Sequence, residues 1–328
     1  MNRRMEISRE TWPLQKPFII ARGKRTETQV VTVTIHEGGY LGRGEGTPSP
    51  RYGENCDSVV EQIERLDQQI QEGLSQEKLQ LVLEPGAARN AVDAALWDLE
   101  VKKTGKNIAE ITGLPWPDDL KTVETISILP VEEMAREARR LRNFPIIKVK
   151  LNAESILDRI KAVRENAPTS ELLVDANESW TLDILRDVAP KLKDLGVVFI
   201  EQPLPAGKDD LLEGYECPLP LGADESCHTS ADLDYLLGKY DFINIKLDKT
   251  GGLSEAIQLE QKAREMGFGV MVGCMLSTSL GIAPAMFLAA KAKYVDLDAP
   301  ALLSRDRDFH LTIHKGKMSP LNRMLWGG

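Results

Sequence analysis

The chain has 328 residues, enough for one large domain of about 250 residues and a smaller attached domain. Its formal net charge is −9, and its 41 lysines and arginines are spread along the chain, so nucleic acid is not an expected partner. The apolar stretch at residues 281–290 is far shorter than the roughly 20 residues of a membrane span, so no membrane association is expected. Four cysteines without regular spacing, and a polar start without a signal-peptide core, predict a cytoplasmic protein.

Two kinds of pattern divide the chain near residue 120. Before that point, strand and helix patterns follow one another without regular alternation, which is typical of a small α+β domain. The predicted strands cover residues 5–12, 28–36 and 40–46, and the predicted helices cover residues 54–72 and 86–103. We therefore expect an N-terminal α+β capping domain over residues 1–120.

A positively charged segment separates the first two predicted strands. Residues 17–28, PFIIARGKRTET, are expected to form a loop in which Arg22, Lys24 and Arg25 lie close together. A solvent-exposed turn is the simplest interpretation of these cations, because charged side chains usually stay hydrated. A role in binding an anionic group is the alternative.

After residue 120, strand patterns alternate with helical patterns such as residues 131–142 and 254–266, at a spacing of about 25 residues. The eight predicted strands cover residues 123–129, 146–150, 172–175, 197–201, 219–224, 242–246, 268–273 and 294–298. Eight such units predict an α/β fold, a (β/α)8-type TIM barrel over residues 121–300. Residues 301–328 lack the pattern, and we expect them to pack back on the capping domain or the barrel.

Acidic residues end three consecutive predicted strands of the barrel. Asp175, Glu201 and Asp224 would therefore meet at its C-terminal mouth, where barrels of this type keep their active sites. Three adjacent carboxylates repel one another unless a cation lies among them, and a set made only of oxygen donors favours Mg²⁺ over Zn²⁺. The alternative is that each acid pairs with a lysine at the barrel rim.

Lysines occupy the strands on either side of these acids. Lys148 and Lys150 lie two apart on the second strand, so both can face the barrel interior, and Lys246 ends the sixth strand. Strands two and six of an eight-stranded barrel are opposite each other. The pattern predicts a proton removed from one face of a carbon and returned to the other, with Lys148 favouring the neutral form of Lys150. A structural ion pair with a nearby acid is the alternative for each lysine.

Asp296 and Asp298 form a further acidic pair on one face of the last predicted strand. They lie outside the metal set, and a pair of acids at the same cavity suits a cationic group of a substrate, such as an ammonium. The alternative is an ion pair with Lys246 or another rim lysine.

The phrases KVK, DAN, EQP, DES, NIKLDKTGG and DLDAP together resemble the enolase superfamily, muconate-lactonising subgroup, and within it the dipeptide epimerases, especially the L-Ala-D/L-Glu epimerases. The resemblance covers nearly the whole chain, including the ARG and RYGE segments and the GAARNAVDAALWDL helix of the first domain. Sites of the enolase superfamily are known to combine a lysine base with Mg²⁺.

This resemblance implies a 1,1-proton transfer at the α-carbon of the C-terminal residue of L-Ala-D/L-Glu, through an enediolate and with one Mg²⁺ per active site. It assigns Asp175, Glu201 and Asp224 as Mg²⁺ ligands, Lys150 and Lys246 as acid/base catalysts with Lys148 as their companion, Asn177 and Glu225 as supports of the metal site, Asp296 and Asp298 as the ammonium site, and the loop with Arg22 and Arg25 as the contact for the C-terminal side chain. The dipeptide would come from cell-wall peptide breakdown.

Three other interpretations remain open. An o-succinylbenzoate synthase or a muconate-type cycloisomerase would share the metal and lysine set, but their substrates lack an ammonium group for the acidic pair. A barrel that binds a carboxylate ligand without turnover is the non-enzymatic alternative. A homo-oligomer is expected from the prevalence of symmetric assemblies.

Overall fold

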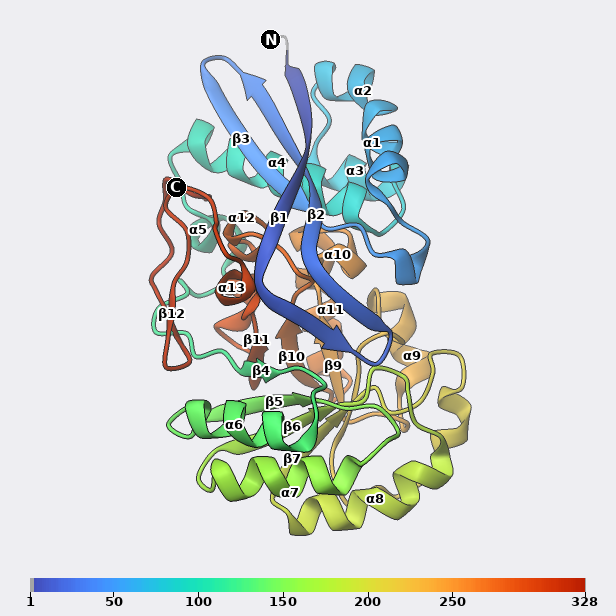
Figure 1. Ribbon diagram of the computed structural model, residues 1–328. Coiled ribbons are helices and arrows are strands. Elements are labelled where there is room, and N and C mark those ends of the chain that lie inside the picture. Colours follow the sequence, from blue (N-terminus) through green and yellow to red (C-terminus); the bar gives the residue numbers. More distant parts are fainter. Residues whose placement is uncertain (1–2, 328) are drawn as a thin grey trace.

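Eight parallel strands close into a barrel in the computed structural model, which describes residues 3–327 (Figure 1). Each strand pairs with its sequence neighbours, and a hydrogen bond of 2.9 Å from Val123 N to Val295 O links the first strand to the last. The barrel strands are β4 (Glu124–Ile126), β5 (Ile146–Lys150), β6 (Glu171–Asp175), β7 (Val197–Glu201), β8 (Leu221–Ala223), β9 (Phe242–Ile245), β10 (Gly269–Gly273) and β11 (Tyr294–Asp296). The predicted (β/α)8-type TIM barrel with an N-terminal α+β capping domain is confirmed.

The helices around the barrel are unequal in length. They are α6 (Val131–Leu141), α7 (Ile156–Asn166), α8 (Leu182–Asp194), α9 (Leu233–Leu236), α10 (Leu247–Thr250), α11 (Leu253–Glu265), α12 (Ser279–Ile282) and α13 (Ala285–Ala289), with 3-10 turns η2 (Asp209–Leu212) and η3 (Ser230–Asp232). The expectation of a full helix in every connection is wrong between β7 and β8, because prolines and glycines at 203, 205, 207, 214, 218 and 220 interrupt that segment. No helix among residues 3–327 has the length and apolarity that a bilayer crossing requires.

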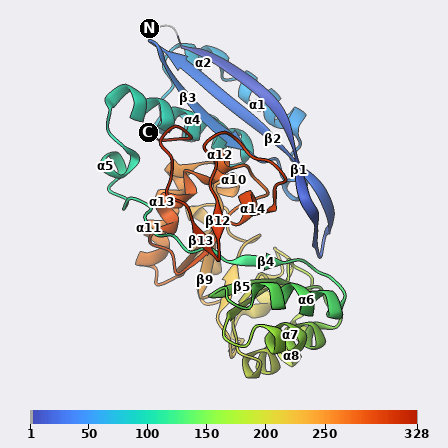
Figure 2. The same cartoon turned by 60° about the vertical axis from the view of Figure 1, so that its left-hand side comes forward.

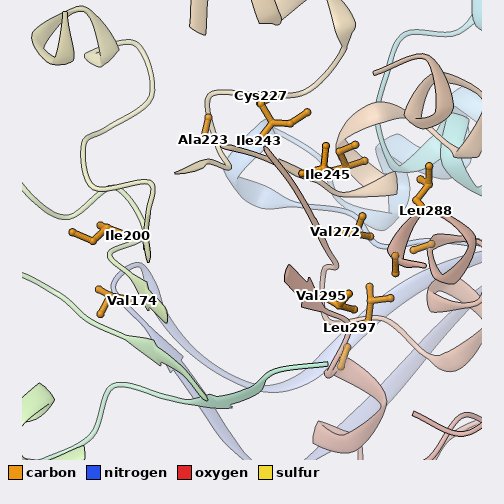
Figure 3. Packing of buried hydrophobic residues seen from close by; sticks show 14 of the residues in the cluster. Val174, Ile200, Ala223, Cys227, Ile243, Ile245, Val272, Leu288, Val295 and Leu297 are labelled. Atoms are coloured by element: carbon orange, nitrogen blue, oxygen red, sulfur yellow. The ribbon is translucent and has the colours of Figure 1, made fainter. Parts of the chain in front are cut away.

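Side chains alternate strictly between the two faces of the barrel wall. Val174, Ile200, Ile243, Val272 and Val295 belong to the apolar cluster between the strands and the surrounding helices (Figure 3). A separate buried cluster lies in the barrel interior, and it contains Val123, Leu173, Phe199, Met271 and Tyr294. Side chains of a strand face the same side at every second residue. The residues two positions after Leu173, Phe199 and Tyr294 therefore also face the interior, and these are Asp175, Glu201 and Asp296.

The capping domain is an antiparallel sheet with helices on one face. Its elements are β1 (Arg4–Ile20), β2 (Gly23–Glu37), β3 (Tyr40–Gly46), the 3-10 turn η1 (Pro50–Tyr52), α1 (Cys56–Glu64), α2 (Asp67–Gln71), α3 (Gln76–Val82), α4 (Ala87–Thr104) and α5 (Ile108–Thr112). The β1–β2 hairpin extends past the helices and reaches down to the barrel (Figures 1 and 2).

Two expectations for this domain are corrected. The predicted loop over residues 17–28 is instead the end of the β1–β2 hairpin, in which Phe18 pairs with Arg25 and Ile20 with Gly23. Backbone hydrogen bonds hold this hairpin, so its charged composition does not prevent strand pairing. The predicted helix over 54–72 is divided into α1 and α2, although buried Ile63 and Ile70 continue one apolar stripe across the break. The sequence also missed the short helix α3.

Strand β3 and helix α4 pack with their backbones in direct contact. A Cβ placed on Gly44 would lie 2.1 Å from the carbonyl oxygen of Ala91, and one on Gly42 or Gly46 would lie equally close to α4. Ala87, Ala91 and Ala95 follow one another every four residues on this face of α4. They lie opposite Gly46, Gly44 and Gly42, which occupy alternate positions of the strand. This packing fixes β3 and the loop that follows it, which reaches the barrel mouth.

Gly44→Ala should therefore destabilise the protein by about 3 kcal/mol or more, because its new methyl group would overlap backbone atoms that cannot move aside. Denaturant unfolding measures this change. Leu41→Ala in the same strand is the control, since Leu41 is 40% exposed and its truncation should change stability by only about 0.5 kcal/mol. Equal stabilities of the two variants would contradict the prediction.

The C-terminal segment contacts both domains. It contains α14 (Ala299–Leu302), β12 (Ile313–His314) and β13 (Lys317–Met318). The Trp326 indole donates to Ala94 O in α4, and Arg307 pairs with Glu45 of β3 at 2.6 Å, while Thr122 N beside the barrel donates to Gly316 O. The division into residues 1–120, 121–300 and 301–328 stays a prediction.

Asp248 of α10 joins the barrel to the capping domain. Its Oδ1 accepts hydrogen bonds of 2.8 Å from Thr47 N and from Asn90 Nδ2. Burial raises the pKa of Asp248 to about 7, well above the value of about 3.9 in an unfolded chain. The folded protein therefore holds a proton here between about pH 4 and 7 that the unfolded chain releases, so this group's contribution to stability falls as pH rises through 7.

Asp248→Asn should remove that pH dependence while keeping the acceptor atom for Thr47 and Asn90. The melting temperature of the variant relative to the parent should therefore rise as the pH increases from 5 to 8. Calorimetry at several pH values measures the difference. A constant difference across this range would show that Asp248 titrates at the same pH in the folded and unfolded states.

Candidate active site

Three carboxylates meet at the barrel mouth as the sequence predicts. Asp175 and Glu201 are the last residues of β6 and β7, and Asp224 directly follows β8. One oxygen of each lies within 4.8 Å of the others, and all three residues are buried. Each of the three offers a carboxylate oxygen, and the set contains no His or Cys. A donor set made only of oxygen atoms fits a hard divalent cation.

Lys148 lies at the centre of the acidic residues and is fully buried. Its Nζ is 3.1 Å from Asp175 Oδ2, 2.6 Å from Glu201 Oε2 and 2.6 Å from Asp296 Oδ2. Burial opposes the charge of Lys148, but these carboxylates outweigh it and raise its pKa well above the usual range. Lys148 therefore remains a cation that compensates several acids, deeper in the barrel than Lys150.

Lys150 and Lys246 lie on opposite walls of the barrel. They come from the end of β5 and from the residue after β9, which are four positions apart in the closed order of eight strands. Lys150 Nζ is 2.5 Å from Asp175 Oδ2, and Lys246 Nζ is 2.6 Å from Asp224 Oδ2. Both lysines line the same cavity, so a ligand held there has an amine on either side.

Lys249 is a buried lysine that the sequence interpretation did not single out. Its Nζ is 2.7 Å from Asp224 Oδ1 and donates to the carbonyl oxygens of Asp224 and Asn244. Burial opposes ionisation of Asp224, but Lys246 and Lys249 outweigh it and hold the pKa of Asp224 well below its usual range. By contrast, burial and the charge of Asp175 raise the pKa of Glu201 to about 7. The three acids are therefore unequal in basicity.

The cavity above the carboxylates has a volume of about 420 Å³ and charged groups of both signs. Lys150, Lys246 and Asp224 line it from the barrel. The capping domain adds four further cations, Arg22, Lys24, Arg25 and Arg51. The end of the barrel near β11 adds two acids, Asp296 and Asp298.

The acidic pair is arranged differently from the prediction of one strand face. Strand β11 ends at Asp296, and Asp298 lies beyond it at the start of α14. Asp296 Oδ2 forms an ion pair with Lys148, so the alternative of pairing with a lysine applies to one of the two acids. Asp298 Oδ2 accepts a hydrogen bond from Thr125 N at 3.0 Å. Burial, reinforced by Asp296, raises the pKa of Asp298 to about 7. A cation at this end of the cavity would favour its ionised form.

The cations of the hairpin have different surroundings. Arg22 Nη1 donates to Glu225 Oε1 at 2.6 Å, to Glu178 Oε2 at 3.0 Å and to Asn177 O at 3.2 Å. Arg25 forms no ion pair with any residue in the described part of the chain and lines the cavity. The sequence grouped these arginines together, but only Arg22 is held by carboxylates.

Asn177 and Glu225 line the cavity beside the three carboxylates. Asn177 N donates to Asp175 Oδ1 at 2.9 Å, and Asn177 Nδ2 lies 3.4 Å from Glu225 Oε1. Asn177 Oδ1 and Glu225 Oε2 are buried without hydrogen-bond partners. These two residues therefore offer free acceptors as well as support for the acids.

Several lining residues were missed by sequence interpretation. Arg51 and Tyr52 belong to the RYGE segment, whose position near the barrel mouth depends on the capping domain packing. Cys274, after β10, lines the acidic end of the cavity, and burial raises the pKa of its thiol well above the usual range. The RYGE segment belongs to the family resemblance, but no local pattern places these residues at the cavity, because they reach it only in the folded protein.

A closed barrel with three carboxylates on consecutive strands and opposed lysines defines a class of metal-binding barrel protein. Family models agree with this class: residues 131–319 match "Enolase C-terminal domain-like", and residues 2–113 match "Mandelate racemase / muconate lactonizing enzyme, N-terminal domain". The chain belongs to the mandelate racemase/muconate lactonizing enzyme family of the enolase superfamily.

Characterised proteins and a solved structure resemble nearly the whole chain. The L-Ala-D/L-Glu epimerase of Escherichia coli (strain K12) is 45% identical over 318 residues, covering 96% of this chain and 99% of that protein. The N-acetyl-D-glutamate racemase of a Pseudoalteromonas species is 44% identical over 301 residues, covering 91% and 95%. An enolase family member from Agrobacterium tumefaciens with homology to dipeptide epimerases, solved with sodium and L-Ala-L-Glu bound, has a TM-score of 0.96 at 43% identity, covering 99% and 100%.

Proposed function

We propose that this protein is an Mg²⁺-dependent isomerase that interconverts the L-Ala-D-Glu and L-Ala-L-Glu dipeptides by moving the α-proton of the glutamate. The observation that carries the proposal is the placement of Lys150 and Lys246 on opposite walls of one cavity, beside a carboxylate triad. The similarity to a dipeptide epimerase at 45% identity supports the same reaction class.

Asp175, Glu201 and Asp224 would hold the Mg²⁺ ion. When bound, the ion supplies Lewis-acid stabilisation of the negative charge that develops on the substrate carboxylate. The protein contributes the orientation of its ligands: Asn177 N and Asn244 Nδ2 donate to Asp175 and Glu201, and Lys249 fixes Asp224. These hydrogen bonds set the carboxylates before substrate arrives.

Lys150 and Lys246 would transfer the proton. In its neutral form, one lysine accepts the α-proton from its side of the substrate, while the other, as an ammonium, donates a proton to the opposite side. The configuration of the carbon is thereby inverted, and the roles reverse for the other epimer. Lys148 stays charged within its cage of carboxylates and would keep the acids fixed.

The two ends of the cavity match the two ends of the dipeptide. Asp296 and Asp298 would bind the free ammonium, and the cationic hairpin would meet the glutamate side chain. Arg25 has the freer guanidinium for this contact, because Arg22 is already paired with Glu225 and Glu178. We further propose that the dipeptide derives from cell-wall peptides and that the enzyme acts in the cytoplasm. We also propose that the protein forms a homo-oligomer, and light scattering would measure its molar mass in solution.

Incubation of the protein with Mg²⁺ and L-Ala-D-Glu in D₂O tests the proposed reaction. NMR should show deuterium at the glutamate α-carbon together with formation of L-Ala-L-Glu. Binding of the dipeptide without either change would instead support the carboxylate-binding alternative. A screen of dipeptides with other residues in each position would then define the breadth of substrates.

Racemisation of N-acetylglutamate is a second candidate, favoured by the 44% identity to an N-acetyl-D-glutamate racemase. N-Acetylglutamate keeps the acyl group and the glutamate of the dipeptide but lacks the ammonium. Both substrates would use the same lysines and metal ligands, so the acidic end of the cavity decides between them. The o-succinylbenzoate synthase and muconate-type cycloisomerase alternatives lack the ammonium as well.

Asp298→Asn separates these candidates. The amide keeps an acceptor for Thr125 N but cannot supply a negative charge, so kcat/KM for L-Ala-D-Glu should fall by roughly tenfold or more. Turnover of N-acetylglutamate or of a cyclohexadiene acid should not fall with it. A parent enzyme that prefers N-acetylglutamate, with no loss of dipeptide turnover in the variant, would favour the second candidate.

A further inference from the structure

Glu178 lies in the loop after β6, between the metal ligands and the capping domain. Asn177 and Glu178 both have positive φ values, 42° and 68°, in the left-handed region that residues with a Cβ rarely adopt. Glu178 N donates to Gln202 O at 2.9 Å, which anchors this strained turn to the loop after β7. The mechanism gives Glu178 no role, although its neighbour Asn177 lines the cavity.

The carboxylate of Glu178 accepts four hydrogen bonds from three other segments. Oε1 accepts from Arg51 Nη2 at 2.6 Å and from Ala206 N at 2.8 Å. Oε2 accepts from Arg51 Nε at 2.7 Å and from Arg22 Nη1 at 3.0 Å. The side chain is only 8% exposed, and these donors lower the pKa of Glu178 against the opposing effect of burial. Glu178 is therefore ionised and fully used as an acceptor.

Two of the donor residues, Arg22 and Arg51, belong to separate segments of the capping domain, and both line the cavity. Arg22 lies at the end of the β1–β2 hairpin, and Arg51 lies in η1 after β3. Arg51 contacts Glu178 through two parallel hydrogen bonds, a geometry that fixes both partners more strictly than a single bond. Arg22 also retains Glu225, whereas Glu178 is the partner shared by both segments.

We propose that Glu178 is a positioning residue that clamps the hairpin end and the η1 segment together over the cavity. One barrel carboxylate thereby sets the position of both capping segments that carry cations toward the substrate. The effect on turnover rests on the proposed epimerase function, whereas the effect on the capping segments rests on the contacts alone.

Glu178→Gln tests the clamp, because glutamine keeps the shape and one acceptor for Ala206 N but loses the charge that attracts both guanidinium groups. Amide hydrogen exchange should become faster at residues 20–25 and at residues 51–53. KM for L-Ala-D-Glu should rise roughly tenfold, while kcat stays within about threefold. Mg²⁺ affinity, measured by calorimetric titration, should not change, because the metal ligands keep their contacts.

Arg51→Gln gives a second and asymmetric test. Glu178 would keep Arg22 in this variant, so exchange should increase at residues 51–53 but not at residues 20–25. Arg51 is 38% exposed, and its replacement should leave the protein folded. Lys16→Met is the matched control, because Lys16 also joins β1 to a barrel carboxylate, Glu137 at 3.1 Å, but with a side chain 72% exposed. This control should change neither exchange nor KM.

The outcomes separate the clamp from the proposed function. Unchanged exchange at both segments in Glu178→Gln would overturn the clamp, and so would faster exchange with an unchanged KM. If the parent enzyme epimerises no dipeptide, the proposed function fails, and the exchange pattern of Glu178→Gln and Arg51→Gln alone decides whether the clamp stands.

Discussion

Lys150→Met and Lys246→Met should each abolish conversion between L-Ala-D-Glu and L-Ala-L-Glu, with a loss of about 10³-fold or more, since proton transfer by a positioned side chain contributes roughly 10²- to 10⁴-fold. Each variant should still exchange the α-proton of one epimer in D₂O. The epimer that exchanges should differ between the two variants, because each lysine faces one side of the α-carbon. NMR of each epimer incubated separately measures this pattern.

These substitutions leave the neighbouring acids with other partners. Asp175 keeps Lys148 at 3.1 Å in the first variant, and Asp224 keeps Lys249 at 2.7 Å in the second. Both variants should therefore fold and bind the dipeptide, which calorimetric titration would confirm. Exchange of the same epimer by both variants, or full conversion by either, would contradict a mechanism with two opposed lysines.

Glu201→Gln should reduce both Mg²⁺ affinity and kcat. The amide removes one of three negative charges while keeping an acceptor for Asn244 Nδ2, which bonds to Glu201 Oε1 at 2.7 Å. Loss of several kcal/mol of charge stabilisation corresponds to a decrease in kcat of about 10²- to 10⁴-fold. Metal titration followed by calorimetry, and kcat at saturating Mg²⁺, measure the two effects separately.

Removal of divalent ions with a chelator should abolish turnover by the parent enzyme, and added Mg²⁺ should restore that turnover. Na⁺ alone should not restore turnover, because a single charge stabilises the developing anion less. Retention of full activity by Glu201→Gln, or by chelated parent enzyme, would show that the triad does not hold the ion used in the reaction.

Most of the barrel and its charged strand ends were predictable from local patterns. Strands β5 and β7 have the bounds predicted from sequence, and Asp175, Glu201 and Asp224 converge because parallel strands bring their carboxyl ends to one edge. The hairpin end at residues 17–28 was missed, since residues 22–28 are polar or charged apart from Gly23 and their strand pairing rests on backbone hydrogen bonds. The connection between β7 and β8 likewise has too many prolines and glycines for the expected helix.

The partners of each charged residue were not predictable. The sequence places Lys148 beside Lys150, but the structure gives Lys148 contacts with acids from three strands, including Asp296 on β11. Glu178 and Arg51 lie far apart in the sequence and carry no pattern that links them. Such contacts depend on the angles and distances between packed elements, which periodicity does not specify.

By itself, the sequence determined that a (β/α)8 barrel presents acids and lysines at one mouth, because strand alternation and chain direction decide which side chains share a face and an end. Only the tertiary structure decided how the capping domain completes the cavity. The hairpin with Arg22 and Arg25, and the η1 segment with Arg51, reach the mouth because β3 packs on α4 and Asp248 holds the two domains together. Their positions arise from packing across long sequence separations, which no local pattern contains.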